Sequence, residues 1–246
     1  MTPVLPPLPA PFGWHGGQIR AALPGGEALF TTRLPAAAGA PIDLKRWNEP
    51  AAWPFGAEAL AADIGIPVAR IAQSHQVHEA RVHSVVSEAD LQAPPSDFDA
   101  QVTTMPDVAC VVRTADCLPI ALIAPEAVGA VHAGWRGLAL GVVQAAVAEL
   151  RELGGTKINA AIGPGARVCC YETGEDVHAA FARFGGRARS GSHADLAAVA
   201  RAILEAEGVT DIHDTGLCTI CEPDLFWSFR REGEAAGRQG VAAWRS

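Results

Sequence analysis

Residues 118–153 read LPIALIAPEAVGAVHAGWRGLALGVVQAAVAELREL, and this stretch carries the clearest structural pattern in the chain. Residues 118–123 and 127–131 are apolar runs of strand length, separated by a Pro-Glu pair. From residue 138 to 153 the apolar side chains recur at helical spacing, and Gly154-Gly155 follows as a stop signal. The stretch therefore predicts two buried strands followed by one long helix.

The rest of the chain extends this alternation of strands and helices in both directions. Further strands are expected at 18–22 and 28–32 around a Pro-Gly-Gly turn, near Ile71, and at 82–86, 108–112, 157–162, 226–229 and 241–244. Further helices are expected at 57–64, 175–184 and 195–207. The fold class is therefore α/β (mixed), with mixed β-sheets flanked by helices. Because no repeat or linker divides the sequence, residues 1–246 are expected to form a single domain, with 1–16 as an extended N-terminal segment.

The composition excludes several classes of protein. With 49% apolar residues the chain can build a large core, and a net charge of −8 argues against binding to nucleic acid or to an anionic membrane. No uncharged apolar stretch reaches the length of about 18 residues that a membrane-spanning helix needs. The proline-rich N-terminus lacks the basic and apolar regions of a signal peptide, so a cytoplasmic protein is expected.

The cysteines are too few for a disulfide-stapled secreted domain, since the chain has only six. Cys218 and Cys221 form a CxxC pair. A zinc knuckle would require a second pair at similar spacing, which the sequence lacks, and Pro223 follows too closely for a thioredoxin-like helix. We therefore expect a structural or incidental role for this pair.

Three short segments place a metal-ligand residue at the end of a predicted strand. They are Gln76-Val77-His78, the TADCLP run with Cys117, and the VHAGWRGL run with His132. Two imidazoles and one thiolate suit Zn²⁺ and leave a fourth coordination position open, which is the arrangement of a catalytic site. From spacing alone, the alternative remains that Cys117 is a buried thiol and the two histidines are hydrogen-bonded core residues.

The same three segments resemble the laccase-domain family, whose members have been called polyphenol oxidases and are now regarded as purine nucleoside phosphorylases. The resemblance runs from about Ala28 to the C-terminus. Further matching segments are Ile162-Gly163-Pro164, Tyr171-Glu172-Thr173-Gly174, Cys218-Thr219, Phe229-Arg230-Arg231 and Gly237-Arg238. One departure is Gly165, which stands where the family usually has cysteine.

The resemblance implies a fold, a metal site and an activity. It implies a layered fold similar to that of the cytotoxic-necrotizing-factor deamidase domain. It also implies a zinc site made by His78, Cys117 and His132, with copper as the other possible metal. The implied reactions are phosphorolysis of adenosine, inosine, guanosine and 5′-methylthioadenosine, and deamination of adenosine. Purine nucleosides and phosphate are thus the expected partners, and the oligomeric state stays open.

Other residues are candidates for roles beside the metal. Asp116 is a candidate for proton transfer, although neighbours on a strand point to opposite faces, so it could equally support the ligands. Arg33, Arg136 and Arg230 are candidates for binding phosphate, because a guanidinium matches an oxyanion; surface ion pairs are the alternative. Trp135 could stack on a purine or pack in the core.

Two other enzymatic functions compete with the nucleoside enzyme. A copper-dependent, laccase-like polyphenol oxidoreductase is one, but a four-copper site needs His-x-His pairs and the sequence has none. A metal-free hydrolase with Cys117 as nucleophile and His132 as base is the other. A non-catalytic binding module is disfavoured because the chain keeps all three ligand candidates.

Overall fold

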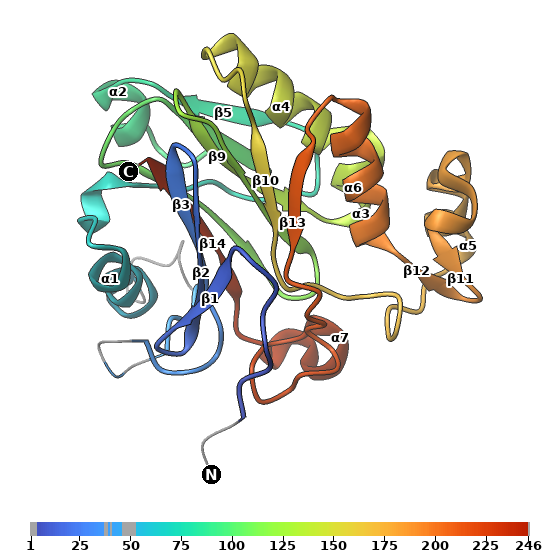
Figure 1. The fold of residues 1–246 in the computed structure, drawn as a ribbon. Coiled ribbons are helices and arrows are strands. Elements are labelled where there is room, and N and C mark those ends of the chain that lie inside the picture. The colour runs from blue at the N-terminus through green and yellow to red at the C-terminus, as the bar shows by residue number, and fades with distance from the viewer. Residues whose placement is uncertain (1–3, 37–38, 40, 46–52, 246) are drawn as a thin grey trace.

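The computed structural model describes residues 4–36, 39, 41–45 and 53–245. Two six-stranded β-sheets pack face to face, and helices cover their outer faces (Figure 1). Both sheets mix parallel and antiparallel neighbours. The expected mixed α/β architecture is therefore confirmed.

The first sheet has the strand order β1-β2-β3-β14-β7-β4. Its strands are β1 (Phe12–His15), β2 (Gln18–Leu23), β3 (Gly26–Phe30), β4 (Ile71–Ala72), β7 (Ala109–Thr114) and β14 (Gln239–Arg245). The expected hairpin is formed by β2 and β3, and the N-terminal β1 adds to its outer edge. β14, the last of the described strands in sequence order, lies between β3 and β7 and is antiparallel to both.

The second sheet has the strand order β13-β10-β8-β9-β6-β5. Its strands are β5 (Val82–Val85), β6 (Ala100–Thr103), β8 (Leu118–Ile123), β9 (Val128–Ala133), β10 (Asn159–Ile162) and β13 (Asp211–Asp214). The two apolar runs of the central stretch are β8 and β9, which pair antiparallel in the middle of this sheet.

Alternation along β8 shows how the layers are held together. Leu118, Ile120 and Leu122 pack toward the helices, whereas Ala121 and Ile123 pack toward the first sheet. A strand that is buried on both faces loses the polar alternation of a surface strand, which explains its continuous apolar sequence. The core therefore lies in the space between the sheets and beneath the helices on either side.

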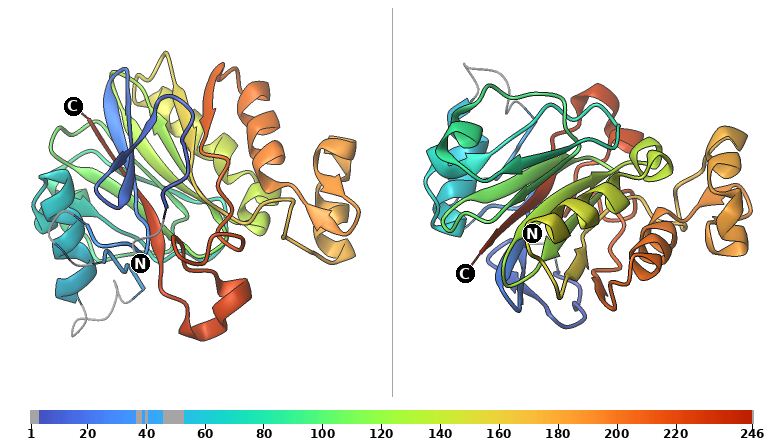
Figure 2. Two further views of the ribbon diagram at one scale, coloured as in Figure 1. Left: turned by 60° about the horizontal axis from the view of Figure 1, so that its bottom comes forward. Right: turned by 90° about the horizontal axis from the view of Figure 1, so that it is seen from above.

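Helices lie around the two sheets, and the one over residues 175–180 projects to one side of them (Figure 2). They are α1 (Trp53–Ile64), α2 (Glu88–Gln92), α3 (Trp135–Leu140), α4 (Val142–Glu152), α5 (Glu175–Ala180), α6 (Leu196–Ala206) and α7 (Phe229–Glu232). Short 3₁₀ turns lie at Val68–Arg70, Ala182–Arg187 and Gly233–Ala235, and β11 (Arg189–Ser190) pairs with β12 (His193–Ala194). α1 covers the first sheet, and α4 and α6 cover the second. Within the described ranges, no helix has the length and apolar character to cross a bilayer.

Three sequence-based expectations about the helices were wrong. The single helix over 138–153 is two helices, because Gly141 adopts φ 97° and ends α3. α3 also begins at Trp135, so the HAGWRG motif runs from strand into helix. The helix over 175–184 ends at Ala180 and continues as a 3₁₀ turn.

The expected strand at 226–229 is a loop that leads into α7. The Ser228 hydroxyl accepts a hydrogen bond from the backbone N–H of Arg231 at 3.2 Å and caps that helix. Phe226 is fully buried in the core between the sheets. Its apolar character therefore reflects core packing from a loop and not a strand.

Candidate active site

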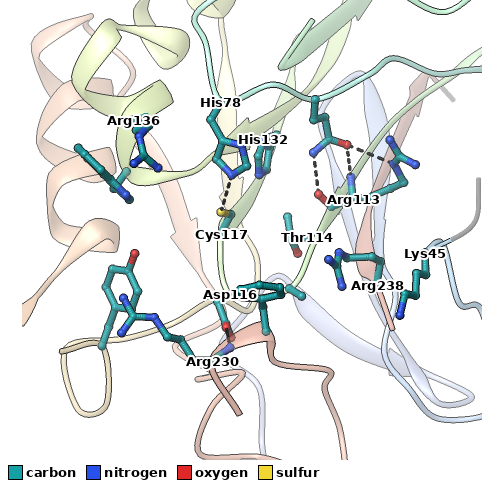
Figure 3. Close-up of a pocket in the computed structure, with 15 residues that line it drawn as sticks. Lys45, His78, Arg113, Thr114, Asp116, Cys117, His132, Arg136, Arg230 and Arg238 are labelled. Atoms are coloured by element: carbon teal, nitrogen blue, oxygen red, sulfur yellow. Dashed lines mark hydrogen bonds between the residues drawn. The ribbon is translucent and has the colours of Figure 1, made fainter. Parts of the chain in front are cut away.

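Three side chains that could hold a metal ion, His78, Cys117 and His132, meet at one end of the second sheet (Figure 3). His132 lies near the end of β9, Cys117 precedes β8, and His78 lies in the loop between β4 and β5. The donor atoms of the three residues all lie within 4.8 Å of one another, and Cys117 Sγ is 3.8 Å from His78 Nε2. The antiparallel pairing of β8 and β9 explains this convergence, because it brings the start of β8 beside the end of β9.

A buried carboxylate, Asp99, positions both histidines. Its oxygens accept hydrogen bonds from the backbone N–H groups of Val77, His78 and Glu79 at 2.8–3.1 Å. His132 Nδ1 lies 2.7 Å from Asp99 Oδ1, which leaves Nε2 of that ring available as a ligand. The same carboxylate thus holds the His78 loop, where His78 itself has φ 64°, and orients the second imidazole.

Asp99 was missed by the sequence analysis. Its only signal is its place in the run Asp97-Phe98-Asp99, directly before the buried strand β6. A carboxylate at the edge of a predicted strand is common in surface loops, and only the fold shows that this one is fully buried.

The electrostatics of the cluster favour a thiolate at Cys117. Burial alone would raise the pKa of this thiol, but the charges and hydrogen bonds of His132 and His78 outweigh it and lower the pKa to about 6. For His132, burial would lower the pKa, whereas Cys117 and Asp99 raise it to about 9. A thiolate and two imidazoles form a donor set that fits zinc.

Gly134 leaves the space in which these ligands meet. A Cβ at this position would lie 2.9 Å from His78 Cδ2 and 3.0 Å from Cys117 Sγ. Gly134 is also the residue before α3, with extended backbone angles. The glycine of the HAGW segment is therefore explained by the close approach of two ligand side chains.

A cavity of about 540 Å³ opens above the three donors. Its lining is basic and aromatic: Lys45, Gln76, His78, Arg113, Thr114, Ala115, Asp116, Cys117, His132, Trp135, Arg136, Tyr171, Phe229, Arg230 and Arg238. Its volume is within the range of small-molecule sites, about 300–1,000 Å³. The excess of cations over carboxylates in this lining favours an anionic ligand.

Two of the predicted arginines lie at the cavity and one does not. Arg136 and Arg230 line it, with their guanidinium groups 4.4 Å and 4.9 Å from the rings of Trp135 and Tyr171. Arg33 is absent from this lining; its Nη1 donates to Pro223 O at 2.8 Å and pairs with Glu232. The structure therefore brings Arg136 and Arg230, but not Arg33, to the site.

Sequence reasoning missed three cations of the cavity, Lys45, Arg113 and Arg238. The Gln76 side chain holds the backbone of Arg113. Gln76 Oε1 accepts a hydrogen bond from the backbone N–H of Arg113 at 2.8 Å, and Gln76 Nε2 donates to the carbonyl of Arg113 at 2.7 Å. Burial and the neighbouring Arg238 lower the pKa of Arg113 to about 10. The Gly237-Arg238 segment was noted for its resemblance, yet only the pairing of β14 with β7 shows that Arg238 lies near Arg113.

Asp116 lies beside the ligands but turns its carboxylate away from them (Figure 3). Oδ1 accepts from Thr219 Oγ1 at 2.7 Å, and Oδ2 accepts from Ser228 Oγ and from the backbone N–H of Arg230. Its backbone has φ 91°, an uncommon value for a residue other than glycine. The sequence left two roles open for Asp116, proton transfer and support of the neighbouring side chains. These contacts favour the supporting role.

The sequence is similar to those of proteins named as enzymes of purine nucleosides. A purine nucleoside phosphorylase of Deinococcus radiodurans is 39% identical over 193 residues, which cover 73% of this chain and 72% of the relative. "Adenosine deaminase RL5" of an unknown prokaryotic organism is 34% identical over 208 residues, which cover 76% and 79%.

Solved structures share the same fold. Neisseria meningitidis protein NMB0706 has a TM-score of 0.79 and 33% identity, over 94% of this chain and 99% of that one. YlmD of Geobacillus stearothermophilus has a TM-score of 0.82 and 26% identity, over 96% and 99%. The model of the family described as multi-copper polyphenol oxidoreductase laccase matches residues 46–246, and the chain therefore belongs to this metal-associated family.

Proposed function

We propose that this protein is a zinc-dependent purine nucleoside phosphorylase that acts on adenosine, inosine, guanosine and 5′-methylthioadenosine and also deaminates adenosine. The observation that carries the proposal is the position of the His78–Cys117–His132 cluster at the floor of a basic, aromatic cavity. The names of the relatives from Deinococcus radiodurans and of RL5 support the choice of purine nucleosides.

The cationic lining suits the phosphate that phosphorolysis needs. Arg113, Arg136, Arg230 and Arg238 supply guanidinium groups around the cavity. Guanidinium pairs well with phosphate oxygens and stays charged at neutral pH. Arg113 Nη2 donates to Ser74 O at 3.1 Å, and Arg238 Nη1 donates to the carbonyls of Ala236 and Gly237 at 2.9 Å, so these two guanidinium groups are ordered before an anion arrives. The arginines therefore bind phosphate and orient it toward the ribose.

Aromatic side chains of the cavity suit the purine. Trp135, Tyr171 and Phe229 line it, and 43% of the surface of Phe229 is exposed. A flat base gains stacking energy of about 1–3 kcal/mol on such a ring. The guanidinium of Arg230 lies over one face of the Tyr171 ring and holds the ring in place.

The donor cluster would hold the metal through His78, Cys117 and His132. When bound, zinc supplies a Lewis acid at the floor of the cavity. Asp99 keeps the His132 ring in one orientation and accepts the hydrogen bond from its Nδ1. Asp116 supports the wall through Thr219 and Ser228, so proton transfer is not assigned to it.

The test is product analysis on purified, metal-replete protein. Inosine with phosphate should give hypoxanthine and ribose 1-phosphate, whereas adenosine without phosphate should give inosine. Arg136→Gln should raise the KM for phosphate by roughly tenfold, as loss of about 1.4 kcal/mol of binding implies. Arg33→Gln, outside the cavity, should change this KM much less. Unchanged nucleosides under both conditions would reject the proposal.

A metal-free Cys–His hydrolase is the second candidate, because the pKa of Cys117 is lowered to about 6 beside His132. A thiol-reactive probe followed by peptide mass spectrometry separates the two functions. If the metal enzyme is correct, Cys117 reacts only after chelation, while the buried thiol of Cys110, whose pKa is raised by burial, stays unlabelled. Activity that survives chelation would favour the hydrolase. Oxygen uptake with phenols would instead favour the copper oxidoreductase.

A further inference from the structure

A second group of metal-ligand side chains lies outside the active site. Cys169, Cys170, Cys218 and Cys221 place their sulfur atoms within 4.8 Å of one another, and Cys169 Sγ is 3.4 Å from Cys221 Sγ. These two cysteines are 52 positions apart in the chain. The sequence analysis found no second pair for the CxxC; the fold supplies one from adjacent cysteines.

The topology of the second sheet explains the convergence. β10 and β13 are parallel neighbours, with Ile162 opposite Asp214, so the chain leaves both strands at the same edge (Figure 1). The pairing continues beyond the strands, where Gly165 forms a parallel bridge with Cys218. Each loop then turns within a few residues, and the turns bring the two cysteine pairs together.

Two arginines hold the backbone of the CxxC loop. Arg231 Nη1 donates to the carbonyls of Thr219 and Ile220 at 2.8 and 3.1 Å. Arg167 Nε donates to Leu217 O at 3.1 Å. A loop that is fixed in this way keeps its sulfur atoms in place before an ion binds, which is the condition for a tight metal site.

The geometry of the sulfur atoms suits one tetrahedral ion. Zinc–sulfur bonds of about 2.3 Å place the four sulfur atoms of a tetrahedron roughly 3.8 Å apart. The backbone N–H groups of Arg167, Cys221 and Ile220 hydrogen-bond to Cys218 and hold its sulfur atom in place. A divalent cation that binds these four sulfur atoms as thiolates would release the thiol protons.

We propose that Cys169, Cys170, Cys218 and Cys221 form a second, structural zinc site, separate from the site in the cavity. Four thiolate ligands leave no open position, so this ion takes no part in the reaction. Its effect is on the cavity wall. Cys170 directly precedes Tyr171, and Thr219, inside the CxxC loop, donates to Asp116. The ion thereby fastens together two loops that carry one side of the cavity.

Metal content of the full-length protein, purified without chelator, tests the proposal. Cys117→Ala removes a ligand of the cavity site, so this variant should retain one zinc ion per chain. Addition of Cys169→Ser and Cys221→Ser should abolish that zinc. Cys110→Ala, at a buried cysteine outside both clusters, is the matched control and should leave the zinc in place. Equal zinc content with and without the Cys169 and Cys221 substitutions would overturn the proposal.

Cobalt provides a second readout in case the multiple variant fails to fold. Co²⁺ added to metal-free Cys117→Ala protein should give the intense visible bands and sulfur-to-metal charge transfer of tetrahedral thiolate coordination. Absence of these bands would overturn the proposal. The proposal would also be overturned if the protein, isolated without reductant, contained no metal and had a Cys169–Cys221 disulfide. The two cysteines would then form a redox pair.

Discussion

The two sulfur-containing clusters of this protein differ in the number of donors and in what surrounds them. The cavity cluster has three donors, lies beneath a cavity of about 540 Å³, and is oriented by the buried carboxylate of Asp99. The four-cysteine cluster has four donors, two of them exposed, and is held by backbone contacts between two loops. A three-donor set with space above it suits chemistry, whereas a closed four-donor set suits stability.

The comparison also shows how one sheet can build two such sites. The cavity cluster uses the antiparallel pair β8–β9, and the four-cysteine cluster uses the parallel pair β10–β13. Since β8 and β10 are neighbours in the sheet, the two clusters are close enough to share a wall. The hydrogen bond from Thr219 to Asp116 is the direct link between them.

Removal of one sulfur atom from each cluster, in separate variants, should give the largest difference in kcat/KM between the two clusters. Cys117→Ala should lower kcat/KM by roughly 10³-fold, since loss of a catalytic metal removes several kcal/mol of transition-state stabilisation. Cys169→Ala should change kcat/KM by less than about threefold, because the second ion does not touch substrate. Steady-state kinetics on inosine with phosphate provides the measurement. Similar losses in both variants would erase the distinction.

A methyl group at Gly134 should disturb only the cavity cluster. In Gly134→Ala the new Cβ would press against His78 and Cys117, so we expect metal affinity at the cavity site to fall by about 10- to 100-fold, as for other losses of ligand orientation. Gly13→Ala is the control, because a Cβ there meets no atom within 4 Å. Zinc titration with a competing chelator measures the change. Unaltered affinity in Gly134→Ala would contradict the described packing.

Neutralisation of Asp99 tests the support beneath the ligands. Asp99→Asn keeps the shape but removes the charge facing His132, and we expect metal affinity to fall about tenfold, at the lower end of such effects. Without the Asp99 charge, the pKa of His132 in the metal-free protein should also fall. NMR titration of the imidazole and chelator competition provide the measurements. Asp97→Asn, a half-exposed carboxylate near His75, is the control and should leave both unchanged.

The link between the clusters should give the smallest effect. Thr219→Val leaves Asp116 Oδ1 without its hydroxyl donor and should lower the free energy of unfolding by about 1–3 kcal/mol. Urea denaturation measures this loss, and kcat should stay within about threefold of the wild-type value. Thr210→Val, at an exposed position, should leave the unfolding free energy within about 0.5 kcal/mol. A large loss of kcat would show that the wall and the ligands are tightly coupled.

Local patterns were enough to predict much of the fold. The apolar runs of β8 and β9 and the helical spacing of α4 follow from burial and periodicity, which the sequence displays directly. The break at Gly141 was missed because its apolar neighbours continue the helical spacing on both sides. The expected strand at 226–229 failed because Phe226 is buried from a loop, and burial alone does not identify secondary structure.

The site was predictable only for residues whose side-chain type by itself indicates a chemical role. The types of His78, Cys117 and His132 and their resemblance to known motifs indicated the donor set. Asp99, Lys45, Arg113 and Arg238 act through their positions in the fold, and no spacing in the sequence indicates that they meet. The four-cysteine cluster was missed for the same reason, since its two pairs are joined by the parallel pairing of β10 and β13.

The place of β14 in the first sheet has a consequence for biosynthesis. This strand follows the other described strands in the sequence and lies between β3 and β7, so the facing edges of β3 and β7 have no partner until β14 has been synthesised. Unpaired strand edges are prone to associate with other chains. Phe229, Arg230 and Arg238 also leave the ribosome late. The ribosome must therefore synthesise the chain through β14 before the cavity can close, and chains that stop before β14 should aggregate.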